Sequence, residues 1–268
     1  MHTSSARPGA LIIIGGHEDK DGEKEILRAV VDALPNKKLV IATIASHEPE
    51  GYFDAYKKAF SELGLDDLTE VYIDERAEAG DAGKLAAFEG AGGVFFSGGD
   101  QLRISSQIGD TPLEERVQHI YASGGVIAGT SAGASAVAET MLVRGANAES
   151  HRIGDLHMAP GLGLIRDVII DQHFAERGRI GRLLGAIAFN PRILGIGVDE
   201  DTAAVVKGEY FEVIGKGAVY VVEASGASYS NIAEAKPLEA LSMFDVRLHV
   251  LSRGDRFDLV RRRPKAAL

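Results

Sequence analysis

Short apolar runs alternate with amphipathic stretches along roughly the first two thirds of the chain. Between the runs, apolar residues recur at helical spacing, as in residues 22–34 and 51–64. The runs predict buried strands at residues 10–16, 38–46, 70–74, 92–99, 126–128 and 168–174. Strands that are apolar on both faces and alternate with helices are typical of parallel sheets. The pattern therefore predicts an α/β fold, with a mostly parallel sheet sandwiched by helices.

The pattern changes after about residue 190. Residues 193–223 contain short β-like runs separated by Lys-Gly turns, which favour antiparallel strands. The sequence shows no Pro/Ser-rich linker between the two regions and no internal repeat. We therefore predict that residues 1–268 form a single domain, with extra antiparallel strands toward the C-terminus.

Composition narrows the possible compartments and partners. The apolar content of 45% and charged content of 25% are those of an ordinary soluble globular protein. The chain contains no cysteine, no apolar run near the roughly 18 residues of a membrane helix, and no apolar signal-peptide core. The net charge of −10 argues against a general nucleic-acid binder. We expect a cytoplasmic protein with neither a nucleic-acid nor a membrane partner.

Residues 124–137, GGVIAGTSAGASAV, place one hydroxyl on a tight turn between small side chains. Gly129, Ser131 and Gly133 match the G-x-S-x-G pattern of a nucleophile elbow, where a strand turns sharply into a helix. The helix that begins at Ala132 could offer backbone N–H groups to a developing oxyanion. A turn chosen only for close packing would have the same composition, so the pattern alone leaves both interpretations open.

A nucleophilic serine requires a base, and the chain has eight histidines. His173 is the best placed, because it ends an apolar run directly after Asp171 and Gln172. The carboxyl ends of parallel strands are where α/β proteins place their sites. His17 and His47 also follow predicted strands and could line a cleft.

A catalytic triad also needs an acid that holds the imidazole in the correct tautomer. Asp199, Glu200 and Asp201 follow another apolar run, and strand alternation places Glu200 opposite its two neighbours. Two groups could instead bind a cation: these three carboxylates, or the set His151, Asp155 and His157.

A tetrahedral intermediate needs a second backbone donor. Gly98 and Gly99 lie at a strand-to-helix turn, where glycine lets the backbone approach a substrate carbonyl, although a simple tight turn would look the same. The order Ser131, His173, Glu200 departs from that of the α/β-hydrolases, in which the acid precedes the histidine.

Three stretches carry a resemblance to a known family: residues 124–139 (GGVIAGTSAGASAVAE), 169–183 (IIDQHFAERGRIGRL) and 195–206 (GIGVDEDTAAVV). In this order they resemble the cyanophycinases, whose serine peptidase family also contains the aspartyl dipeptidase called peptidase E. The resemblance covers most of the chain and implies a fold like that of the class I glutamine amidotransferases, with serine in place of cysteine. The stretch GGHEDKDGE, residues 15–23, is interpreted as a variable region.

The resemblance implies a role for each matching residue. Ser131 would be the nucleophile, His173 the base and Glu200 the acid, with the backbone N–H groups of Gly99 and Ala132 as the oxyanion hole. The implied substrate pocket is formed by Gln101, Asp171, Gln172, Arg177, Arg179 and Arg182. No metal and no organic cofactor is implied, and the family's tendency to dimerise implies a homodimer.

Cyanophycin is a poly-aspartate backbone with an arginine joined through an isopeptide bond to each β-carboxylate. Each repeat therefore presents a carboxylate and a guanidinium, which suit arginines in the pocket and Asp171, respectively. The arginines could also form a solvated helix face. We expect a serine exopeptidase that hydrolyses cyanophycin to β-aspartyl-arginine through an acyl-enzyme. The alternatives are an aspartyl dipeptidase acting on short aspartyl peptides, an esterase, and a non-catalytic binding module.

Overall fold

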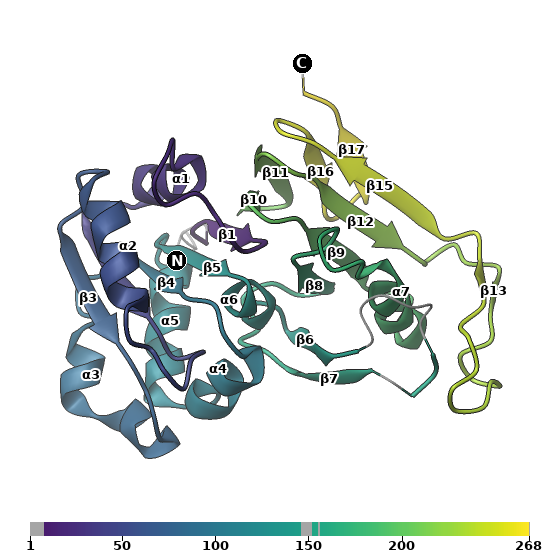
Figure 1. Ribbon diagram of the computed structural model, residues 1–268, viewed down its shortest axis with the longest axis horizontal. Coiled ribbons are helices and arrows are strands. Elements are labelled where there is room, and N and C mark those ends of the chain that lie inside the picture. The colour runs from purple at the N-terminus through teal and green to yellow at the C-terminus, as the bar shows by residue number, and fades with distance from the viewer. Residues whose placement is uncertain (1–7, 146–151, 155, 268) are drawn as a thin grey trace, which may run out of the picture.

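The computed structural model describes residues 8–145, 152–154 and 156–267. Within them, the largest sheet has nine strands in the order β17-β16-β11-β10-β1-β5-β4-β2-β3 (Figure 1). Its parallel part consists of β1 (Leu11–Ile14), β2 (Lys38–Ala42), β3 (Asp67–Val71), β4 (Gly93–Phe96) and β5 (Val126–Thr130). Antiparallel strands extend it: β10 (Thr202–Lys207), β11 (Tyr210–Gly215), β16 (Arg256–Asp258) and β17 (Arg263–Lys265). These strands confirm the predicted fold class.

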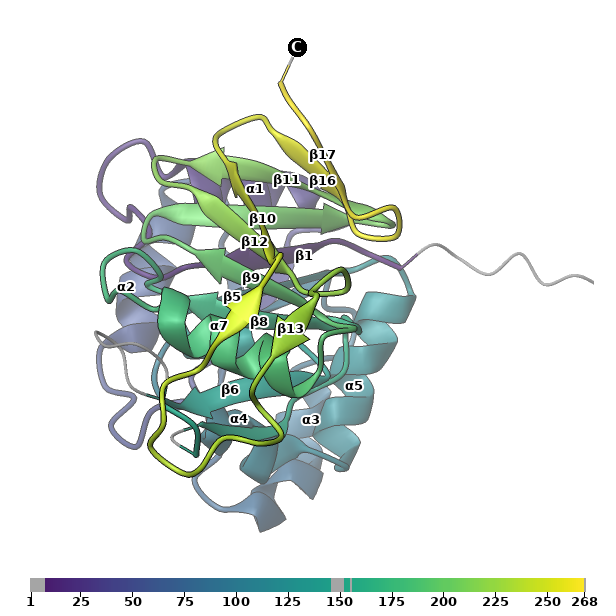
Figure 2. The same ribbon diagram turned by 90° about the vertical axis from the view of Figure 1, so that its right-hand side faces the viewer.

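A second sheet lies beside the first and has the order β15-β12-β9-β8 (Figure 2). Its strands are β8 (Val168–Gln172), β9 (Leu194–Val198), β12 (Val219–Glu223) and β15 (Arg247–Leu251). Only β8 and β9 run parallel among the strand pairs of this sheet. Two strand pairs complete the described part of the chain: β6 (Thr140–Arg144) with β7 (His157–Pro160), and β13 (Tyr229–Ser230) with β14 (Met243–Phe244).

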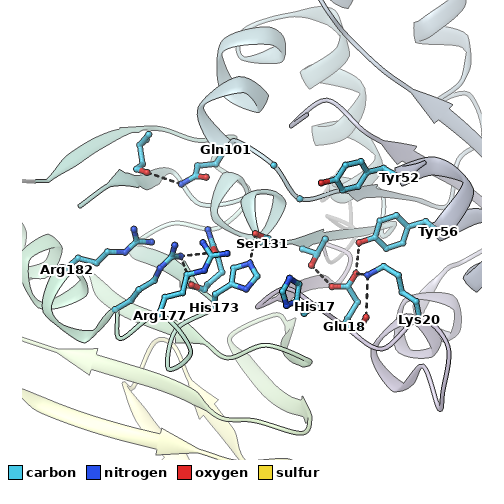
Figure 3. A pocket seen from close by; sticks show the side chains of 16 residues that line it. His17, Glu18, Lys20, Tyr52, Tyr56, Gln101, Ser131, His173, Arg177 and Arg182 are labelled. Atoms are coloured by element: carbon cyan, nitrogen blue, oxygen red, sulfur yellow. Dashed lines mark hydrogen bonds and ion pairs between the residues drawn. The ribbon is translucent and has the colours of Figure 1, made fainter. Parts of the chain in front are cut away.

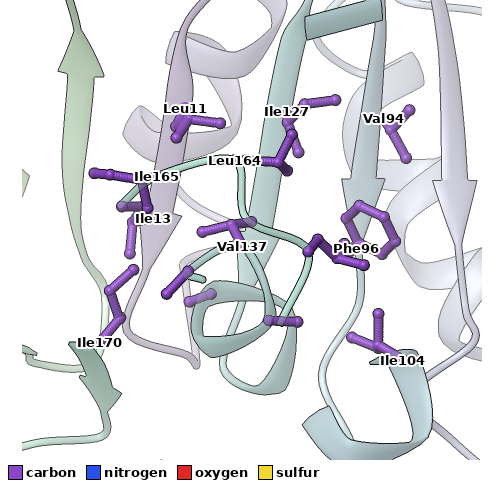
Figure 4. Close-up of a cluster of buried hydrophobic side chains, with 14 of the residues drawn as sticks. Leu11, Ile13, Val94, Phe96, Ile104, Ile127, Val137, Leu164, Ile165 and Ile170 are labelled. Carbon is purple, nitrogen blue, oxygen red and sulfur yellow. The ribbon is translucent and has the colours of Figure 1, made fainter. Parts of the chain in front are cut away.

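Helices cover both faces of the large sheet, and the alternation of side chains along β1 shows how. Ile12 and Ile14 pack with α1 (Glu25–Ala33) and α2 (Tyr52–Ser61). Leu11 and Ile13 point to the opposite face, which is apolar as well (Figure 4). That face is covered by α3 (Ala82–Ala86), α4 (Gln101–Ile108), α5 (Pro112–Ala122) and α6 (Ala132–Ala136), with the 3-10 helix η1 (Arg76–Gly80) beside them.

The second sheet shares a core with the first. Ile170 and Ile196 of the second sheet belong to the same buried cluster as Leu11 and Ile13 (Figure 4). Helix α7 (Ile180–Phe189) covers the other face of the second sheet, where Leu183 is fully buried. No helix of the described residues is long and apolar enough to cross a membrane. That residues 1–268 form one domain stays a prediction.

One predicted strand lies at different residues. The run expected at 70–74 forms β3 three residues earlier, at Asp67–Val71. Strand β3 is at the edge of the sheet and pairs only with β2, so several of its side chains are partly or fully exposed. Polar residues are tolerated there, and the apolar pattern therefore does not mark the strand.

Candidate active site

Ser131 occupies a strained turn between β5 and α6. Its backbone has φ 52° and ψ −111°, outside the usual regions for a residue with a side chain. A Cβ added at Gly129 would lie 2.4 Å from the backbone of Gly133, and one added at Gly133 would lie 2.6 Å from the Phe96 carbonyl oxygen. The Ser131 N–H donates to the Ile14 carbonyl at 3.0 Å. Both glycines of the predicted elbow are thus required by close backbone contacts.

Ser131, His173 and Glu200 form one chain of hydrogen bonds, and Figure 3 shows the bond between Ser131 and His173. Ser131 Oγ lies 2.9 Å from His173 Nε2, and His173 Nδ1 lies 2.6 Å from Glu200 Oε1. His173 follows β8 and Glu200 follows β9. Because these two strands are parallel neighbours, their carboxyl ends bring the two side chains to the same edge of the sheet.

His17 lies on the other oxygen of the same carboxylate. Its Nδ1 is 2.9 Å from Glu200 Oε2, and its ring meets the His173 ring edge-on with centroids 5.1 Å apart. His47, the other candidate at a strand end, contacts Arg103 instead, at 3.0 Å. The sequence therefore indicated correctly that His17 follows a strand toward the cleft, but not which side chain it meets.

The pKa values of the triad favour its active form near neutral pH. Burial lowers the pKa of His173, as does the charge of Arg177, and together these outweigh the hydrogen bond that His173 donates to Glu200. Burial acts to raise the pKa of Glu200, but hydrogen bonds from His173 and His17 outweigh it, so the pKa lies below its usual value. A neutral imidazole beside a carboxylate is the state that a general base requires.

The three carboxylates Asp199–Asp201 do not converge on a cation site. Asp199 accepts from the backbone N–H groups of Ala175 and Ala218, and Asp201 accepts from the Asp19 N–H and pairs with Lys216. In the second predicted metal group, His151 and Asp155 lie outside the described residues. The ligand atoms of His17, His173 and Glu200 lie within 4.8 Å of one another, but they are the atoms already joined by the triad's hydrogen bonds. A metal ion there would compete with the triad.

The turn Gly98-Gly99 passes directly beside the nucleophile. A Cβ added at Gly98 would lie 3.4 Å from Ser131 Cβ and 3.8 Å from Ser131 Oγ. Gly99 has φ +143°, and a Cβ there would lie 2.4 Å from the Ala45 carbonyl oxygen. Ala132 begins α6, where the first N–H groups have no partner within the helix. The backbone of both predicted oxyanion donors therefore lies close to Ser131.

A cavity of about 370 Å³ opens at Ser131, and polar side chains dominate its wall on both sides (Figure 3). We call one side the basic arm, which is lined by Gln101, Gln172, Arg177, Arg179 and Arg182. We call the other side the tyrosine arm, which is lined by Glu18, Lys20, Tyr52 and Tyr56.

Asp171 forms ion pairs with two arginines of the basic arm. Its side chain is 1% exposed, and its oxygens accept from Arg179 Nη1 at 3.2 Å, from Arg182 Nε at 2.6 Å and from Arg182 Nη2. Burial lowers the pKa of Arg179 to about 10. Asp171 is therefore paired with the protein's own guanidinium groups, and a direct contact between Asp171 and a substrate guanidinium stays a prediction.

Arg177 and Gln101, two other residues of the basic arm, differ in exposure and in their contacts with the rest of the protein. Arg177 is exposed and forms no ion pair with any residue that the structure describes. Because α7 begins at Ile180, Arg177 lies in a turn, and its N–H donates to the His173 carbonyl at 3.1 Å. Gln101 Nε2 donates to the Leu142 carbonyl at 2.8 Å, which ties α4 to β6.

Sequence reasoning missed the tyrosine arm. Glu18 accepts hydrogen bonds from Tyr56 Oη and Thr130 Oγ1, both at 2.5 Å, and Lys20 Nζ lies 3.0 Å away. Tyr56 is one of the buried residues of α2, so its position in the helical pattern is that of an ordinary core residue. The one usable signal was that Glu18 follows His17 at the end of a buried strand.

Comparisons with known proteins show which family the chain resembles. The profile of peptidase family S51 matches residues 11–214. A cyanophycinase of Geminocystis herdmanii (strain PCC 6308) is 40% identical over 263 residues, which cover 97% of each chain. A cyanophycinase of Nostoc sp. (strain PCC 7120) is 40% identical over 266 residues, 98% of this chain and 89% of that one.

Solved structures share the fold at low sequence identity. A peptidase from an acI-B1 Actinobacterium superposes with a TM-score of 0.66 at 21% identity, covering 95% of this chain and 98% of that one. A putative peptidase E from Listeria monocytogenes EGD-e gives a TM-score of 0.50 at 17% identity, with 78% and 98% covered. The match to the family profile and the two relatives at 40% identity establish that this chain belongs to peptidase family S51.

Proposed function

We propose that this protein is a cyanophycinase, a serine exopeptidase that hydrolyses cyanophycin to β-aspartyl-arginine dipeptides. The observation that carries the proposal is the hydrogen-bonded chain Ser131–His173–Glu200 at the mouth of a pocket with an arginine-rich wall. The two relatives that share 40% of their residues with this chain over nearly its whole length are both cyanophycinases.

In the first half of the reaction, His173 Nε2 takes the proton of Ser131 Oγ, which attacks a backbone aspartyl carbonyl. The N–H groups of Gly99 and Ala132 bind the oxyanion of the tetrahedral intermediate. His173 then protonates the leaving amine, and the acyl-enzyme remains. Glu200 keeps the imidazole in the tautomer that has its proton on Nδ1, and it stabilises the imidazolium.

In the second half, a water molecule takes the place of the leaving amine. His173 removes a proton from this water, and the resulting oxygen attacks the acyl carbon. The second tetrahedral intermediate collapses and breaks the bond to Ser131 Oγ, which regains its proton from His173. The products are the free carboxyl group and the regenerated enzyme.

The basic arm binds substrate carboxylates in this proposal. Arg179 and Arg182 pair with Asp171, whereas Arg177 forms no ion pair with the described residues, so Arg177 adds a positive charge to the arm. Arg177 is the exposed member and can clamp a carboxylate bidentately. Asp171 then acts through Arg179 and Arg182, while Gln101 and Gln172 line the wall beside them.

The test is to incubate the purified protein with insoluble cyanophycin and to identify the soluble products by mass spectrometry. Release of β-aspartyl-arginine by the wild type, and its loss in a Ser131→Ala variant with an unchanged circular dichroism spectrum, is the expected result. Intact polymer together with cleavage of short aspartyl peptides would instead identify an aspartyl dipeptidase. An active Ser131→Ala variant would overturn the assignment of the nucleophile.

The homodimer that the resemblance implies and the cytoplasmic location expected from the composition are part of the same proposal. Light scattering of the purified protein tests the oligomeric state, and fractionation of the producing cells tests the location.

A further inference from the structure

The tyrosine arm contains a carboxylate that is fixed in place. The side chain of Glu18 is 0% exposed, and the hydroxyls of Tyr56 and Thr130 hold its two oxygens from different sides. Thr130 immediately precedes the nucleophile in the sequence, so the Glu18 carboxylate is hydrogen-bonded to the residue next to Ser131. The arm is therefore positioned to contact the part of a substrate that extends from Ser131 away from the basic arm (Figure 3).

A cation already occupies this arm. Lys20 Nζ lies 3.0 Å from Glu18 Oε1 and 4.9 Å from the centroid of the Tyr56 ring. A carboxylate and an aromatic face together are a typical cation site. The Lys20 side chain is 29% exposed and has no other carboxylate partner among the described residues, so it can turn outward to solvent.

The pairing of the acidic groups around the cavity also indicates Glu18 as the acceptor for a substrate cation. A substrate guanidinium needs an acceptor, and Asp171 is occupied by Arg179 and Arg182. Glu200 is occupied by His173 and His17. Among the described residues that line the cavity, Glu18 is the one carboxylate, and only a flexible lysine neutralises it.

We propose that the tyrosine arm is a guanidinium subsite, in which Glu18 and the ring of Tyr56 bind an arginine side chain of the substrate after Lys20 turns out to solvent. A guanidinium is planar, less strongly hydrated than an ammonium and stacks on aromatic rings, so it replaces the lysine favourably. Tyr52, which is partly exposed, forms the second aromatic wall of the subsite. The assignment of the arginine side chain rests on the proposed function, whereas the preference for a guanidinium follows from the arm alone.

Binding of n-butylguanidine, measured by calorimetry and compared with n-butylamine, tests the subsite without any hydrolysis. In the wild type we expect the guanidine to bind more tightly than the amine. Lys20→Met removes the competing ammonium and is expected to tighten butylguanidine binding at least threefold, whereas Glu18→Gln is expected to weaken it at least tenfold. Lys57→Met is the matched control, because Lys57 covers the Phe53 ring at 5.7 Å on the same helix but does not line the cavity.

Two outcomes would overturn the subsite: weaker or unchanged binding in Lys20→Met, or unchanged binding in a folded Glu18→Gln variant. If Glu18→Gln does not fold, Tyr52→Leu takes its place, with weaker guanidine binding as the expected result and unchanged binding as the refuting one. Because the probe is not hydrolysed, its binding separates the two proposals. A guanidine site in a protein that leaves cyanophycin intact would refute only the function. Hydrolysis by a protein that lacks such a site would refute only the subsite.

The Michaelis constant for cyanophycin shows whether Lys20 only fills the subsite or binds the substrate itself. If Lys20 only fills the subsite, Lys20→Met lowers KM at least twofold. A rise in KM would mean that Lys20 binds a substrate carboxylate, and it would refute the proposal.

Discussion

Replacing Asp171 by asparagine tests whether this carboxylate supports the basic arm or meets the substrate. Asp171→Asn keeps the shape of the side chain but removes the negative charge that pairs with Arg179 and Arg182. Both guanidinium groups are about as buried as Asp171, and Arg179 Nε already has no hydrogen-bond partner among the described residues. The variant therefore leaves the buried guanidinium of Arg179 without its carboxylate partner.

Removing one partner of a buried ion pair typically costs about 3–5 kcal/mol of unfolding free energy. For a chain of this size, each kcal/mol lowers the melting temperature by roughly 2–4 °C, so we expect a fall of about 6–20 °C. Activity is expected to fall with it, because the arginines lose their fixed positions. The double variant Asp171→Asn/Arg179→Met, which also removes the unpaired charge of Arg179, is expected to be more stable than the sum of the single changes predicts.

Thermal and urea unfolding followed by circular dichroism measure this effect. Asp21→Asn is the matched control, because the Asp21 side chain is 88% exposed and its pair with Lys58 spans 3.5 Å. It is expected to change the unfolding free energy by less than about 0.5 kcal/mol. An Asp171→Asn protein within about 1 kcal/mol of the wild type would refute the supporting role and return Asp171 to the list of substrate contacts.

Three further changes test the triad and its surroundings. Burial, and then the charge of Arg177, hold the pKa of His173 below 6.5, and activity is lost as the pH falls through that pKa. Arg177→Gln removes the charge and is therefore expected to move the acidic limb of the kcat/KM profile to higher pH. Arg177→Lys keeps the charge and should leave the limb in place. Gly16→Ala, whose Cβ would lie 2.3 Å from the His173 ring, is expected to lower kcat at least about a hundredfold, whereas Gly51→Ala, also at positive φ but with open space around it, should not. His17→Ala is expected to lower kcat/KM less than about tenfold, because Glu200 Oε1 still holds His173; a loss comparable to that of Ser131→Ala would contradict this.

The sequence was most informative where a residue's position follows from strand ends alone. Ser131, His173 and Glu200 each follow an apolar run, and parallel strands place such residues at one edge. This placement brings His173 and Glu200 together, because β8 and β9 are parallel neighbours, but it does not explain how they meet Ser131, because β5 belongs to another sheet that the apolar pattern did not distinguish.

The ion pairs within the site could not be predicted in the same way. Three arginines and an aspartate within twelve residues are compatible with either substrate binding or internal pairing. The choice depends on burial, because a carboxylate that is removed from water must be paired. Burial of Asp171 results from the packing of α7 on the second sheet, which the local sequence does not encode.

The topology also explains why residues 15–20 belong to the active site, although they were interpreted as a variable region. Strand β1 lies between β5 and β10, with Ile14 level with Thr130 on one side and with Ala203 on the other. The chain that leaves β1 must therefore pass between the nucleophile turn and the segment that carries Glu200. Its successive side chains reach both: His17 contacts Glu200, and Glu18 contacts Thr130. Substitutions in this segment can thus change what the tyrosine arm binds while Ser131 and His173 keep their positions.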